Sequence, residues 1–169
     1  MAVIGIRWDL VEAAQIAMCF VLYAATERPL PRKAWRSDAP DLSVTPLTKD
    51  ETSIKAHFSK PEIQNIGSTS GCGCDFPYMR YQNGGWPWFD DPEDDAEQEA
   101  SDRYNREALA ALLRACGEHI VELYGVWDGD IAKPPQAREE ISLKALTGPS
   151  FRFKERGVLR RACGSDESA

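Results

Sequence analysis

The residue types most able to do chemistry stand together in one short stretch, from Gly67 to Phe76. It contains three glycines, three hydroxyl side chains and a Cys-Gly-Cys pair formed by Cys72 and Cys74. Small residues gather where a backbone must bend sharply or approach another group closely. In an extended segment the two thiols would project to the same side, because side chains alternate along a strand. We therefore look for a functional site here first.

Three hypotheses explain the thiol pair. Two thiolates could occupy two corners of a tetrahedral zinc site, which makes zinc the candidate cofactor and Cys72 and Cys74 the candidate ligands. In a redox pair, one thiolate attacks and the other resolves. In a structural reading, both are small, buried side chains in a tight bend. The remaining ligands of a zinc site would come from Cys19, Cys116, Cys163, His57 and His119.

The same stretch and the one after it also have features of a binding surface. Successive backbone N–H groups in a Gly/Ser/Thr bend form a concave nest for an anion. The spacing matches neither the P-loop nor the dinucleotide-binding fingerprint. Residues 76–89 are aromatic and rich in turns, and aromatic side chains provide large contact areas at interfaces. The expected ligand-binding residues are Ser68, Thr69, Ser70, Trp86 and Trp88.

Other titratable residues fit ordinary structural roles. The carboxylates at residues 90–99 suit the start of a helix, where the helix dipole favours acidic side chains. His57 and His119 stand in no catalytic motif. Whether the protein is an enzyme is therefore left open by its sequence.

One long helix is predicted at about 92–116. Asp91 can cap it, Pro92 suits its first position and Gly117 suits its end. An apolar stripe along the helix predicts that it packs against a sheet. The residues of this stripe are Ala100, Tyr104, Ala108 and Leu112, with Leu109, Leu113 and Cys116 beside them.

Several strands are predicted around this helix, which indicates an α+β fold with a mainly antiparallel sheet. The predicted strands are 19–24, 42–45, 62–66, 120–127 and 151–159. A short helix is expected at 10–17, residues 49–58 fit either a helix or a strand, and 140–146 are a short element of uncertain type. We expect residues 1–17 to be an appendage, 18–162 a single domain and 163–169 a frayed tail.

Composition narrows the compartment and the partners. The net charge of −7 disfavours nucleic-acid binding, which needs clustered Lys and Arg to neutralise phosphates. Five cysteines without regular spacing favour reduced thiols in the cytoplasm over a secreted disulfide framework. The apolar run at 16–25 is too short to span a bilayer, and the positive charge that precedes a signal peptide is missing.

From about Met18 onward the chain resembles a group of uncharacterised bacterial proteins that share a Gly-Cys-Gly-Cys-x-Phe loop. The matching segments are Phe58–Pro61, Ile66–Phe76, the acidic helix and Glu122–Gly129. The resemblance implies a bacterial, cytosolic setting and a folded unit that begins near Met18. It implies no catalytic residues.

Taken together, the sequence favours a non-catalytic protein that binds a protein or small-molecule partner near the Cys-Gly-Cys pair. Two alternatives stay open. One is a thiol- or zinc-dependent enzyme that uses Cys72 and Cys74. The other is an acidic inhibitor or immunity-type protein, whose net negative charge would attract a basic partner.

Overall fold

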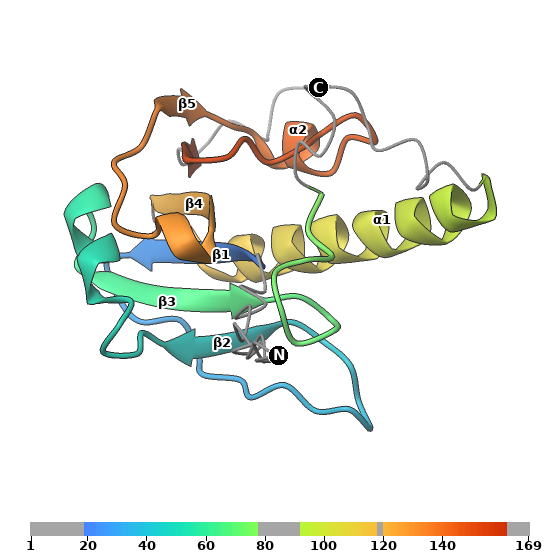
Figure 1. Cartoon of the computed structure of the whole chain (residues 1–169), viewed down its shortest axis with the longest axis horizontal. Coiled ribbons are helices and arrows are strands. Elements are labelled where there is room, and N and C mark those ends of the chain that lie inside the picture. The colour runs from blue at the N-terminus through green and yellow to red at the C-terminus, as the bar shows by residue number, and fades with distance from the viewer. Residues whose placement is uncertain (1–18, 78–91, 118–119, 162–169) are drawn as a thin grey trace, which may run out of the picture.

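The structure is a computed structural model that describes residues 19–77, 92–117 and 120–161 (Figure 1). Its centre is a six-stranded sheet with the strand order β2-β3-β1-β4-β6-β5. Neighbouring strands are antiparallel except for β5 and β6, which are parallel. The predicted α+β fold with a mainly antiparallel sheet is confirmed. The strands are β1 (Phe20–Thr26), β2 (Ser43–Pro46), β3 (Glu62–Gly67), β4 (Val121–Trp127), β5 (Ala137–Glu140) and β6 (Gly157–Arg161).

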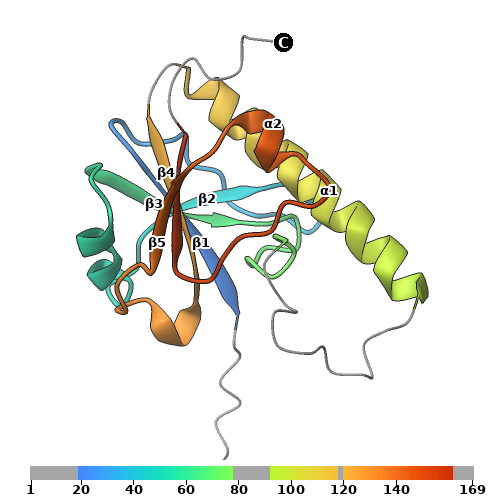
Figure 2. The same cartoon turned by 90° about the horizontal axis from the view of Figure 1, so that it is seen from above.

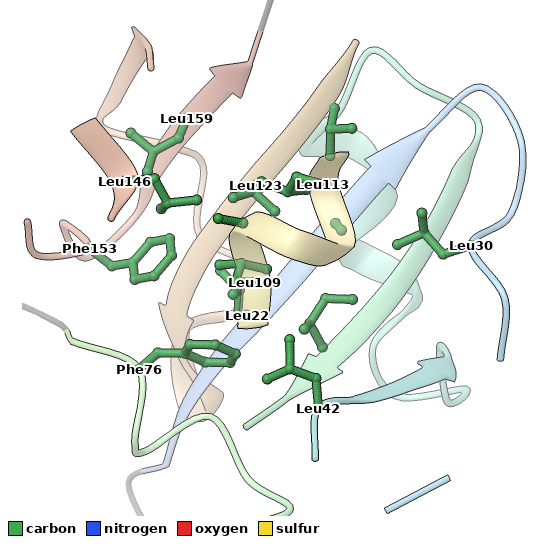
Figure 3. Packing of buried hydrophobic residues seen from close by; sticks show 14 of the residues in the cluster. Leu22, Leu30, Leu42, Phe76, Leu109, Leu113, Leu123, Leu146, Phe153 and Leu159 are labelled. Atoms are coloured by element: carbon green, nitrogen blue, oxygen red, sulfur yellow. The ribbon is translucent and has the colours of Figure 1, made fainter. Parts of the chain in front are cut away.

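One face of the sheet is covered by helices α1 (Pro92–Ala115) and α2 (Leu143–Leu146) (Figure 2). Alternate residues of β1 face these helices, as the strand period requires. Figure 3 shows Leu109 and Leu113 of α1 next to Leu22 and Leu123 of the central strands, and all four belong to one buried cluster. Phe153 joins the same cluster from the segment before β6.

The opposite face is covered by two short 3-10 helices, η1 (Thr52–His57) and η2 (Asp128–Asp130) (Figure 2). The other alternate residues of β1 and β4, Tyr23 and Tyr124, lie in a second cluster with Ile54 and Ile131. Strands β1 and β4 are therefore buried on both faces, which explains why their sequences are almost wholly apolar.

Polar groups on this second face have partners within the fold. The Tyr23 hydroxyl donates to Glu51 Oε1 at 2.8 Å, and burial together with this carboxylate raises the pKa of Tyr23. Glu122 is only 4% exposed and accepts from the backbone N and the Oγ of Ser59 at 2.7 and 2.8 Å. The carboxylate thus ties the segment before β3 to the sheet.

Most predicted elements are confirmed, with one clear correction. The last strand begins at Gly157 and not near residue 151. Phe153 instead donates its backbone N–H to Pro77 O at 2.6 Å, and Arg156 takes a φ of 55°. A positive φ turns the chain, so residues 151–156 cannot continue the strand.

Two segments of ambiguous pattern are now assigned. Residues 49–58 contain the 3-10 helix η1. The segment 140–146 combines the last residue of β5 with α2, whose N-cap Ser142 accepts a hydrogen bond from the N–H of Ala145 at 3.1 Å. The predicted helix at 10–17, the appendage and the tail lie outside the described residues.

The packing of Phe20 against Gly125 predicts a cost for adding one methyl group there. A Cβ at Gly125 would lie 2.3 Å from Phe20 Cζ, and Trp127 and Phe153 hold that ring at centroid distances of 6.0 and 6.1 Å. We expect Gly125→Ala to lower the free energy of unfolding by about 1–3 kcal/mol through overpacking, measured by urea denaturation.

Gly129→Ala is the matched control, since nothing lies within 4 Å of a Cβ at that glycine. Its free energy of unfolding should change by less than about 0.5 kcal/mol. Equal stability of the two variants would contradict the packing described for Phe20.

Candidate functional site: the Cys-Gly-Cys loop

Residues 67–76, here called the Cys-Gly-Cys loop, leave the end of β3 as a series of bends and turns. Gly71 has a φ of +89°, the Ser68 N–H donates to Cys72 O at 2.7 Å, and the Phe76 N–H donates to Gly73 O at 3.1 Å. The segment is therefore not extended, and strand alternation does not decide how the two thiols are placed. The positive φ and the short-range hydrogen bonds curl the chain instead.

The loop closes around its own carboxylate. Ser68 Oγ donates to Asp75 Oδ2 at 2.9 Å, and the Ser70 N–H donates to the same oxygen at 3.2 Å. The Thr69 N–H donates to Asn105 Oδ1 at 3.0 Å. These donors are already engaged, so a phosphate bound in the loop would have to displace Asp75.

The loop also packs directly on the central strand. A Cβ at Gly73 would lie 2.1 Å from the backbone oxygen of Phe20. Backbone can come this close to backbone only at a glycine. The glycine between the two cysteines is therefore explained by the docking of the loop on β1.

The two thiols interact with each other. Cys72 Sγ accepts from the backbone N–H of Cys74 at 3.3 Å and lies 3.5 Å from Ser70 Oγ. Burial raises the pKa of Cys74 to about 12, with further contributions from its hydrogen bond to Cys72 and from the nearby Cys19 thiol. The Cys74 thiol is thus protonated at neutral pH, which opposes its use as a nucleophile.

The other predicted zinc ligands are distributed across the fold. Of the described candidates outside the pair, Cys19 acts electrostatically on Cys74. Cys116 follows the end of α1 and donates to Leu112 O at 3.3 Å, while His57 Nε2 lies 3.1 Å from Ile131 O on the opposite face of the sheet. Among the described residues, no group of three or more His, Cys, Asp or Glu is placed to hold a metal ion. Cys163 and His119 lie outside those residues.

Trp35 completes the exposed side of the loop. Its Nε1 donates to Thr69 O at 2.8 Å, and a Cβ at Gly71 would lie 2.9 Å from its Cδ2 atom. The indole is nevertheless 40% exposed. Sequence reasoning missed Trp35, because it lies in a proline-rich connection and its hydrogen-bond partner Thr69 is 34 residues away. Trp86 and Trp88, which were expected here, lie outside the described residues.

The buried face of α1 differs from the face that its apolar pattern predicted. Leu109 and Leu113 are fully buried, but Tyr104 is 53% exposed and Ala100 is exposed as well. The prediction that these two belong to the buried stripe is wrong. The buried face continues instead through polar residues one and two turns before Leu109.

These residues form a buried polar face, defined as Asp102, Asn105 and Arg106, which are 6%, 0% and 1% exposed. Asn105 Nδ2 donates to Thr69 Oγ1 at 3.2 Å. The Asn105 amide therefore bonds Thr69 through both its oxygen and its nitrogen. Positions three and four residues before Leu109 are Arg106 and Asn105, and a second step of three or four residues reaches Asp102. Their polarity concealed them from a search for apolar residues.

Arg106 is the side chain of this face whose hydrogen-bond donors are not all paired. Its Nη2 donates to Glu99 Oε1 at 2.8 Å, whereas Nε and Nη1 are buried without a hydrogen-bond partner. An unsatisfied buried donor costs about 1–3 kcal/mol, and more when it is charged. The hydrogen bond from Arg106 lowers the pKa of Glu99, and Arg152 and Arg103 add to this effect.

Comparison of the chain with models of protein families, with curated proteins and with solved structures gives no match. Within the described part of the chain, no helix is both long and apolar enough to cross a membrane. The function must therefore be argued from the geometry of the loop and its supports.

The environment of Cys74 predicts slow alkylation. A pKa of about 12 against the usual 9.0 lowers the thiolate fraction roughly 1000-fold at pH 8, and higher intrinsic nucleophilicity restores only about 20-fold. Iodoacetamide should therefore modify Cys74 about 50-fold more slowly than the same cysteine in a peptide of residues 67–76, as measured by mass spectrometry.

The pH dependence provides a second check. The reactive species is the thiolate, so the rate should rise about tenfold per pH unit and keep rising above pH 9. A rate that levels off below pH 9 would contradict the protonated, buried state of this thiol.

Proposed function

We propose that the protein is a non-catalytic binding protein of the bacterial cytosol, which binds a protein or small-molecule partner at the Cys-Gly-Cys loop and Trp35. The observation that carries the proposal is that this surface is held in place before any partner arrives. Trp35 is fixed by Thr69 and Gly71, yet two-fifths of it faces solvent. A fixed, exposed indole loses little entropy on binding and is a frequent hot-spot residue.

The chemistry of the loop supports binding over catalysis. Thiol catalysis needs a thiolate near neutral pH, whereas burial and the neighbouring thiols keep Cys74 protonated. The hydroxyls of Ser68 and Ser70 are engaged with Asp75 and with each other, and these contacts maintain the shape of the loop.

The cytosolic setting is supported by the cysteines. Among the described residues no disulfide bond joins Cys19, Cys72, Cys74 and Cys116, which suits a reducing compartment. The resemblance to bacterial proteins supports the proposed origin. The acidic composition keeps an inhibitor of a basic partner as a special case of the same binding role.

The proposal predicts that binding depends on Trp35. Partners would be sought by affinity purification and by thermal-shift screening of metabolites, and then measured by calorimetry. Loss of a hot-spot contact worth about 2 kcal/mol means that Trp35→Ala should weaken the affinity about 30-fold.

Tyr104→Ala is the matched control, because Tyr104 is the other large exposed aromatic residue among those described. It should leave the affinity within about twofold. If the partner is a basic protein, its affinity should fall steeply with salt. Turnover of a thiol, phosphate-ester or peptide substrate that is abolished in Cys72→Ser or Cys74→Ser would overturn the proposal.

A further inference from the structure

A buried arginine beneath the surface of α1 has more hydrogen-bond donors than the fold satisfies. Arg106 is 1% exposed, and its Nη2 donates to Glu99 Oε1 at 2.8 Å. Its Nε and Nη1 atoms are buried without a partner. Native structures seldom leave such donors unmatched, so each one requires an explanation by water, an ion or a ligand.

A second arginine lies beside the first. Arg152 Nη2 is 3.5 Å from Glu99 Oε2, and its Nη1 donates to the carbonyl oxygens of Pro149 and Phe151 at 2.9 and 2.7 Å. The single carboxylate of Glu99 is therefore shared between two guanidinium groups. The Glu99 side chain is 45% exposed, so it can leave without unpacking the core.

A third arginine acts on the same carboxylate. Arg103 also acts electrostatically on Glu99, which leaves three cations around one carboxylate. Asp102, an acid on the same helix, accepts through Oδ1 from Gln98 Nε2 at 2.7 Å.

We propose that Arg106 and Arg152 form a site for an oxyanion, the carboxylate or phosphate group of a bound molecule, which takes the place of Glu99. An oxyanion that replaces Glu99 at Arg106 Nη2 also reaches Nη1, because the two nitrogens share one edge of the planar guanidinium. Glu99 occupies the site in the unbound protein and keeps Arg106 from being wholly unpaired.

This inference rests on the proposed function, since it names a group that the bound partner presents to α1. The link is Asn105, which precedes Arg106 on the same buried face and holds Thr69 of the Cys-Gly-Cys loop. A molecule that contacts the loop and carries an oxyanion would thus meet two adjacent parts of one surface.

The test measures binding of inorganic phosphate and of acetate to the full chain by calorimetry and thermal unfolding, with ionic strength held constant. For the oxyanion that fits, Tm should rise by about 3 to 6 °C for each tenfold increase in concentration above Kd. Arg106→Met should abolish this rise. Glu99→Gln removes the competing carboxylate and should tighten binding about tenfold.

Arg114→Met is the matched control, because Arg114 is an exposed arginine on the same helix, and it should bind like the wild type. Arg152→Ala and Glu99→Gln alter partly exposed side chains, so they decide the matter even if Arg106→Met does not fold. Trp35→Ala should keep the phosphate or acetate response.

Absence of any response in both the wild type and Glu99→Gln would overturn the site and indicate that water satisfies Arg106. Binding that survives in Arg106→Met and Arg152→Ala would mean an adventitious ion only. Either result would leave partner binding through Trp35 untouched, so the two proposals fail separately.

Discussion

The fold depends on one constraint, which is that the central strands β1 and β4 must be buried on both faces. Their side chains alternate between the cluster under α1 and the cluster under the two 3-10 helices. Neither cover is optional, because exposing either set would return several large apolar side chains to water. The segments that connect the strands therefore contain the helices that cover the two faces of the sheet.

The same constraint places the Cys-Gly-Cys loop. It extends from β3, the neighbour of β1, and lies on the first residue of β1, where Gly73 leaves room for the Phe20 carbonyl. A bent loop beside a buried sheet must satisfy its own backbone groups. Asp75 within the loop and Asn105 from α1 accept its N–H groups. The loop is thus shaped by supports that lie far apart in the sequence.

One face of helix α1 both covers the sheet and supports the Cys-Gly-Cys loop. Its last two turns pack Leu109 and Leu113 on the sheet, whereas the turn before them directs Asn105 and Arg106 toward the same side. Buried polar residues are tolerated when they are paired. Asn105 meets this condition through the loop, and Arg106 meets it only at one nitrogen. Asn105 therefore makes a structural contact, whereas Arg106 still has donors for a ligand.

The sequence by itself determined the α+β class, the long helix ending before Gly117 and the first four strands, because apolar periodicity and helix-end residues are local signals. It also located the loop. Only the tertiary structure decided the supports of that loop, since Trp35 and Asn105 gain their roles from Thr69, which is 34 and 36 residues away from them. The polar edge strand β5, with the sequence Ala-Arg-Glu-Glu, carried no alternating pattern. The protonated state of Cys74 likewise follows from burial, which no local spacing of cysteines reveals.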